Sequence, residues 1–155
     1  MRCSVLVAFF ASETSPADFQ QELMGTRVVT GSNICDHRMV DDLANDFEVI
    51  PDHLVMLCDA VLEEVLEPRS LELLAFSMLA SDHFVWDSDT GPGQLVAETI
   101  QDWSSPEVNY ALRFDTIAKF RHRLLSGEDT FTESDADGRP PAGGRVVWRN
   151  RKPSS

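Results

Sequence analysis

The candidate metal-ligating and catalytic residues lie mainly in one acidic stretch, residues 82–98. Asp87 and Asp89 flank a serine, and Glu98 follows eleven residues after Asp87, where a calcium-binding loop has its bidentate glutamate. The fifth and sixth positions of such a loop would be Gly91 and Pro92. They supply neither a side-chain oxygen nor the glycine that the sharp turn needs. We therefore expect no metal ion at this stretch.

Carboxylates in the same stretch could also act as a general acid and base, with His83 beside them. The chain, however, has no glycine-rich phosphate loop, no His-Glu-x-x-His motif and no Gly-x-Ser-x-Gly turn. Cys35 and His37 are spaced like two metal ligands, but a structural zinc site needs four. The sequence thus predicts a protein that is not an enzyme and has no catalytic residue, metal or cofactor.

The remaining interpretation of the stretch is a binding surface. Trp86 stands among the carboxylates, where it could be a core side chain or an aromatic anchor of an interface. Glu98 and Asp102 are four residues apart, so they share one face of a helix, and we expect that face to lie beside the loop. The predicted partner-binding residues are Asp82, Trp86, Asp87, Asp89, Glu98 and Asp102.

The charge of the chain narrows the kind of partner. Its formal net charge is −13, and residues 36–107 carry 17 acidic side chains against Arg38 and Arg69 alone. A protein that binds nucleic acid neutralises phosphates with basic side chains, so nucleic acid is excluded as a partner. The acidic middle is either a solubilising surface or a surface shaped for a basic protein.

The sequence pattern predicts that helices carry or flank these residues. Proline and capping signals together with helical spacing predict an all-α fold, a compact bundle of about five or six helices. Residues 4–11 alternate like a strand, but we favour a short helix. Residues 25–38 are predicted to form a loop. Further helices are predicted at residues 16–24, 41–47, 51–67 and 71–80, then from residue 92 or 93 onward, with another start at residues 105–107 and a last helix that ends at Gly127.

The predicted helix over residues 71–80 is apolar nearly all round, so we expect it at the centre of the bundle with Phe76 in the core. Residues 1–127 form the predicted domain. Residues 128–155 form a polar tail, disordered or loosely docked, in which we interpret Asp135 and Asp137 as solvated. The basic end of the tail could fold back on the acidic bundle.

Two further features concern location. No apolar run approaches the roughly 18 to 20 residues that span a bilayer, and the run at residues 5–11 is short for a signal peptide. The three cysteines, Cys3, Cys35 and Cys58, form an odd set without a Cys-x-x-Cys pair, which is typical of reduced thiols. We therefore expect a cytoplasmic protein that does not contact a membrane.

Two segments, together about 21 of the 155 residues, resemble the colicin D immunity protein family. Residues 9–19 (Phe-Phe-Ala-Ser-Glu-Thr-Ser-Pro-Ala-Asp-Phe) are similar to its first helix, Ala-Ser turn and acid-Phe pair. Residues 80–89 (Ala-Ser-Asp-His-Phe-Val-Trp-Asp-Ser-Asp) are similar to its Asp-x-Asp run. The resemblance implies a small helical bundle whose acidic surface plugs the basic active site of a transfer-RNA-cleaving toxin. It places Asp82, Asp87 and Asp89 on that surface.

The family pattern is shorter than this chain, since the helix at 51–67 and the segment after Trp103 have no clear counterpart in it. The sequence therefore leaves two function classes open. One is an immunity protein that neutralises a basic toxin, a nuclease by resemblance. The other is a non-catalytic acidic scaffold or regulatory interaction module. An enzyme with an unrecognised site is the least favoured reading.

Overall fold

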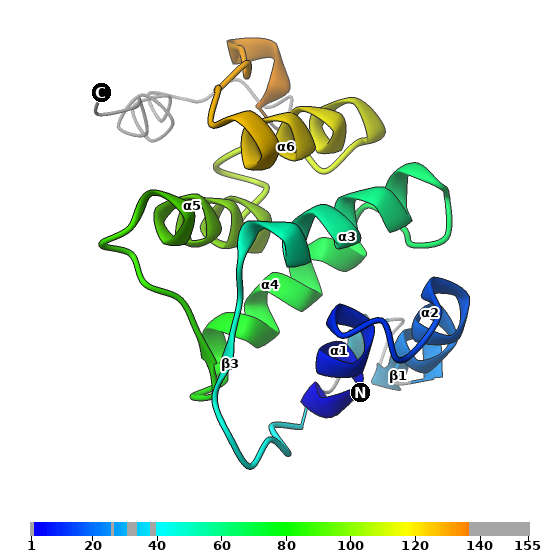
Figure 1. Cartoon of the computed structure of the whole chain (residues 1–155). Coiled ribbons are helices and arrows are strands. Elements are labelled where there is room, and N and C mark those ends of the chain that lie inside the picture. Colours follow the sequence, from blue (N-terminus) through cyan, green and yellow to red (C-terminus); the bar gives the residue numbers. More distant parts are fainter. Residues whose placement is uncertain (1, 26, 31–33, 38–39, 137–155) are drawn as a thin grey trace.

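The computed structural model describes residues 2–25, 27–30, 34–37 and 40–136 (Figure 1), and this part of the chain is a mostly helical, compact bundle. It contains six α-helices, as the sequence predicts. They are α1 (Cys3–Phe10), α2 (Pro16–Gly25), α3 (Pro51–Leu62), α4 (Ser70–Ala80), α5 (Gly91–Ser104) and α6 (Phe114–Ser126), followed by a short 3-10 helix η1 (Glu133–Asp135). No helix within these ranges is long and apolar enough to cross a membrane.

The helices pack in pairs around one core. α3 packs against α6, α4 against α5, and α1 against α2. Figure 1 shows α6 at one end of the molecule and the α1–α2 pair toward the other, with α3, α4 and α5 between them. The largest fully buried side chains come from most of these helices; they include Trp103, Phe19, Phe120, Leu6, Leu57, Leu74 and Met78.

The helix predicted over residues 51–67 ends earlier than its apolar pattern indicated. α3 stops at Leu62, and Glu64 has a φ of 64°, a left-handed conformation that interrupts the helix. The chain then turns so that Leu66 is buried in the core. The helix start predicted at residues 105–107 is also wrong, because the carbonyl of Ser105 accepts from Val108 and Asn109 in a single turn that does not continue.

Two short pairs of strands form where the sequence predicts a loop and a helix. β1 (Arg27–Thr30) pairs antiparallel with β2 (Ile34–His37), where we predicted a loop. β3 (Phe47–Glu48) pairs in parallel with β4 (Phe84–Val85), and Phe47 had been assigned to a helix. Residues 41–46 are not helical either. Burial alternates from residue 47 to residue 50, with Val49 buried and Glu48 exposed, as in a strand.

The prediction that α4 is buried all round is wrong. Leu71, Leu74, Ala75 and Met78 are buried, but Phe76 is 64% exposed and Leu79 is 38% exposed. The physical reason is that α5 covers only one side of α4. The helix therefore keeps an apolar side that the described residues do not cover.

The fold continues past Gly127, which closes α6 with a φ of 81°. The ring of Phe131 stacks on Tyr110 at 4.1 Å between centroids. Asp135 is buried, which corrects our reading of it as solvated, because Lys119 Nζ lies 2.6 Å from one of its carboxylate oxygens. Residues 128–136 are thus packed against the bundle. Asp137 and the basic end of the chain lie outside the described residues.

Candidate functional site

The acidic stretch predicted from the sequence forms the exposed link between α4 and α5. The side chains of Asp82, Asp87 and Asp89 are all exposed. Asp87 Oδ1 accepts a hydrogen bond from the Asp89 amide at 3.0 Å. The Asp87 carbonyl accepts from the amide and the hydroxyl of Thr90, and the Thr90 hydroxyl in turn caps α5 by accepting from the Gly93 amide. The link is therefore fixed to the first turn of α5.

Gly93 is required for this arrangement. A Cβ atom at this position would lie 1.7 Å from the carbonyl oxygen of Asp87, far inside van der Waals contact. Any side chain at Gly93 would push the link away from α5. The glycine thus sets the position of Asp87 and, through it, of Asp89.

The parallel pairing of β3 with β4 brings a second acidic segment beside residues 81–85, the first part of this link. Residues 41–48 contribute Asp41, Asp42, Asp46 and Glu48, all exposed. Asp41 accepts hydrogen bonds from the Ser81 hydroxyl at 2.8 Å and from the Asp82 amide at 3.3 Å. We call the exposed carboxylates of the two segments the acidic edge. They are Asp41, Asp42, Asp46, Glu48, Asp82, Asp87 and Asp89. In Figure 1 this edge follows β3 and the chain that enters α5.

Hydrogen bonds keep part of the acidic edge ionised. The Ser81 hydroxyl, and then the ring of His83, lower the pKa of Asp41 below its ordinary value. The hydroxyl and amide of Ser4 lower the pKa of Asp42 in the same way, helped by the charge of Arg2. Both carboxylates therefore carry a full negative charge at neutral pH.

Basic side chains compensate little of this charge. Six Lys and Arg residues have described side chains, and five of them form salt bridges with carboxylates outside the acidic edge. These five are Arg69, Arg113, Lys119, Arg121 and Arg123. The sixth, Arg2, is the one beside Asp42. Within the described part of the chain, the acidic edge presents a concentrated negative potential.

Three of the predicted partner-binding residues are not fully exposed to solvent. Asp102 is completely buried, which contradicts our prediction that it binds a partner. Its carboxylate pairs with Arg123 of α6 at 2.9 Å, so α6 covers this side of α5. Glu98 is half-buried on α5. Trp86 is half-buried and packs against the core, so only part of its ring remains accessible.

The residue types of a hydrolase triad meet at Asp41, Ser81 and His83. The hydrogen bonds among these three residues, however, are not those of a catalytic triad. Ser81 donates its hydroxyl to Asp41 and accepts from the His83 amide. The His83 ring contacts Asp41 through Nδ1 at 3.1 Å. In a nucleophilic triad the hydroxyl bonds to the histidine ring instead. These three side chains thus hold the turn between α4 and β4 against the segment at Asp41.

The described cysteines are poor nucleophiles. Cys3 and Cys58 are buried and unpaired. Burial, helped by the charges of Asp41 and Asp42, raises the pKa of Cys3 to about 11. Burial also raises the pKa of Cys58. The thiols therefore stay protonated at neutral pH. The side chains of Cys35 and His37 lie outside the described residues.

The described side chains hold no group of three or more His, Cys, Asp and Glu arranged to bind a metal ion. Glu98 stands half-buried on α5, while Asp87 is engaged with the Asp89 amide. What the arrangement offers is a row of fixed anions. It can neutralise cationic groups of another molecule.

Comparison with known proteins yields no relative of this chain: no family model, no curated protein and no solved structure matches it. The site residues that sequence reasoning missed are those of residues 41–48. Their one signal in the sequence is the excess of acidic residues between positions 36 and 107. This excess of acidic residues does not indicate which acidic segments lie next to each other in the folded protein.

Proposed function

We propose that this chain is an immunity protein that binds and neutralises a basic protein toxin without catalysis, acting in the cytoplasm. The observation that carries the proposal is the acidic edge, where carboxylates from two separate segments meet with little compensation from described basic side chains. The resemblance of residues 9–19 and 80–89 to the colicin D immunity protein family supports a nuclease, of the transfer-RNA-cleaving kind, as the toxin.

The physical basis is charge complementarity. A nuclease must hold phosphates, so its active site is positively charged. Carboxylates fixed by hydrogen bonds, such as those of Asp41 and Asp87, can take the place of these phosphates with little loss of side-chain freedom. Opposite charges also steer the two proteins together, so association is fast at low salt.

The test is binding to the basic toxin encoded beside this chain in its own genome. Replacing both Asp87 and Asp89 by Asn removes two charges while keeping size and hydrogen bonding. We expect this double variant to stay folded, to associate at least about tenfold more slowly and to protect cells less. The matched control replaces Glu13 and Glu22 by Gln, since both are exposed carboxylates of the α1–α2 end. The control should bind as the natural protein does.

Three results would change this conclusion in different ways. If the control variant loses protection and the Asp87 and Asp89 variant keeps it, the surface is wrong although the function stands. If association with the toxin is insensitive to added salt, charge complementarity is not the basis of binding. If no basic toxin binds at all, the acidic scaffold or regulatory module is the better description.

A further inference from the structure

An exposed apolar strip lies on α4 next to the acidic edge. It consists of Leu73, Phe76, Leu79 and Ala80, spaced three and four residues apart so that they share one side of the helix. Phe76 leaves 64% of its surface exposed, which is unusual for a phenylalanine in a helix of the central layer. An apolar strip bordered by charged residues is typical of a surface that binds another protein.

A cavity of about 220 Å³ opens beside this strip. It lies between α4, the first turn of α1 and the segment at Asp41, and its lining residues are Cys3, Asp41, Leu73, Phe76, Ser77, Ala80 and Ser81. An apolar cavity of about 150 Å³ accommodates a benzene ring. The cavity on this chain therefore has room for one large apolar side chain of another molecule.

The rim of the cavity is acidic. Asp41 lines it, and Asp41 also holds the Asp82 amide, while Asp42 is the next residue along the chain. Arg2 is the described basic side chain near this rim, and the other described Lys and Arg residues are in salt bridges elsewhere. An occupant of the cavity would thus meet the apolar side chains of Leu73, Phe76 and Ala80, the polar groups of Ser77 and Ser81, and the negative charge of Asp41.

We propose that the strip and its cavity bind a segment of a partner protein in which one aromatic side chain is flanked by arginine or lysine. The aromatic ring enters the cavity against Phe76, and the basic side chains pair with Asp41, Asp42 and Asp82. This inference rests on the proposed function, because it assigns the apolar anchor of the same interface. A second copy of this chain fits poorly, since its net charge of −13 would bring like charges together.

The test uses the full chain and three short synthetic peptides as probes. The first carries a central tryptophan flanked by arginines, the second has alanine in place of the tryptophan, and the third has glutamates in place of the arginines. We expect the first peptide to bind at least about tenfold more tightly than either of the others, measured by calorimetry.

Variants locate the binding site. Phe76→Ser and Leu79→Ser change exposed residues, so the fold should remain intact, which circular dichroism checks. We expect each to bring the affinity for the tryptophan peptide close to that for the alanine peptide. Leu125→Ser is the matched control, because Leu125 is 56% exposed on α6, and it should have no effect.

The outcomes separate this inference from the proposed function. If the tryptophan and alanine peptides bind equally, or if Phe76→Ser leaves binding unchanged, the anchor is wrong while the acidic edge keeps its own test with Asp87 and Asp89. If the glutamate peptide binds as tightly as the arginine peptide, the acidic rim plays no part and the inference fails. If sedimentation shows a dimer that Phe76→Ser dissociates, the strip is an interface between two copies instead.

Discussion

Among the described residues, Asp102 and Arg123 form the one buried salt bridge that joins two long helices. Asp102 is on α5 and Arg123 on α6, and both side chains are almost completely excluded from solvent. The guanidinium also donates to the Thr99 hydroxyl at 3.1 Å and lies over the rings of Phe120 and Phe131. The pair therefore ties α5, α6 and the segment at Phe131 together.

Replacing Arg123 by Met should strongly destabilise the fold. The variant leaves the carboxylate of Asp102 buried without its cation, and the expected cost is about 3 to 5 kcal/mol in the free energy of unfolding. Adding Asp102→Asn to the same chain removes the buried charge and should recover part of this loss. Urea unfolding of the single and double variants measures both effects. Equal stability of the Arg123→Met variant and the natural protein would show that the pair contributes nothing.

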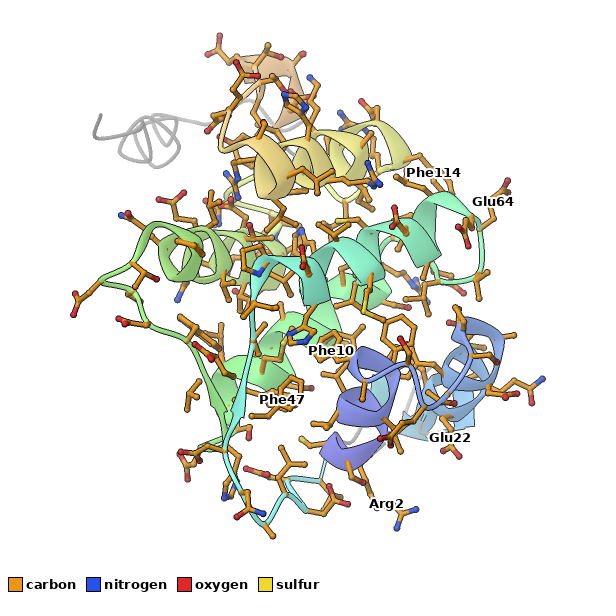
Figure 2. All side chains as sticks on the ribbon, in the orientation of Figure 1. Arg2, Phe10, Glu22, Phe47, Glu64 and Phe114 are labelled. Atoms are coloured by element: carbon orange, nitrogen blue, oxygen red, sulfur yellow. The ribbon has the colours of Figure 1, made fainter. Side chains whose placement is uncertain are left out.

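His53 gives the fold a dependence on mildly acidic pH. Its ring stacks on Phe10 and lies tilted against Phe47, and Nδ1 accepts from the Ile50 amide at 3.1 Å, which requires a ring without a proton on Nδ1. Figure 2 shows Phe10 and Phe47 facing each other in this cluster. Burial lowers the pKa of His53 below its ordinary value, against the opposing charges of Asp52 and Glu48.

A lowered histidine pKa means that the unfolded chain binds the proton more readily. The stability from His53 is therefore present above about pH 6.5 and is lost as the pH falls below it. We expect the Tm of the natural protein to fall more between about pH 7 and pH 5 than that of His53→Phe, which keeps the stacking and does not titrate. Thermal melts across this range make the comparison. Parallel curves for the two proteins would exclude His53 as the cause.

At the residue scale, the sequence identified the exposed carboxylates Asp82, Asp87 and Asp89 but not the two that are buried in the described part of the chain, Asp102 and Asp135. Asp82, Asp87 and Asp89 are exposed as we expected, since they follow a helix and precede a proline-containing helix start. Asp102 could not be placed, because helical spacing says which residues share a face and not which element covers that face. The arginine that pairs with it, Arg123, comes from α6 and lies 21 residues later in the chain.

At the scale of elements, most helices were predictable and the strands were not, although the helices predicted at residues 41–47 and from residues 105–107 do not form. Pro16, Pro51 and Pro92 each stand at a helix start, and Gly127 stands just past a helix end, where local chemistry decides the structure. β3 and β4 are only two residues long, and each exists because the other segment lies beside it. Such a pairing leaves no periodic pattern in the sequence, so the site at the acidic edge could not be assembled from sequence alone.

The exposed side of α4 leads to a prediction that reverses the sequence-based one. Phe76→Ala should cost less than about 1 kcal/mol in unfolding free energy, because most of the ring already faces solvent. Phe120→Ala should cost about 3 to 5 kcal/mol, because Phe120 is fully buried against Trp103 and Phe131. Chemical unfolding of the two variants side by side decides the matter. A large loss for Phe76→Ala would place α4 inside the core after all.

At the scale of the whole molecule, the charges are segregated. Four of the six described Lys and Arg side chains stand on α6 or just before it, and each pairs there with a carboxylate: Arg113, Lys119, Arg121 and Arg123. The described cations therefore hold the fold together around α6, whereas the acidic edge at β3 and β4 keeps most of its charge. This distribution allows the edge to change its charge without disturbing the salt bridges that support the bundle.

Residues 128–136 lie at the α6 end of the molecule, where most of the described cations are, and the last prediction concerns these residues. Phe131 stacks on Tyr110 and lies tilted against Phe120, and Asp135 pairs with Lys119, so residues 128–136 cover one side of α6. Phe131→Ala should cost about 1 to 2 kcal/mol, because the side chain is half-buried and full burial of a phenylalanine contributes about 1.5 to 3 kcal/mol.

The matched control is Phe114→Ala. Phe114 is 47% exposed at the first turn of α6, so its loss should cost less than about 1 kcal/mol. Hydrogen exchange gives a second readout, because weakening the contact of Phe131 should also speed exchange of the Ala111 amide, which donates to the Asp135 carbonyl. If the two phenylalanine variants are equally stable and the Ala111 amide stays protected, residues 128–136 add nothing to the domain. The boundary at Gly127 predicted from the sequence would then be the correct one.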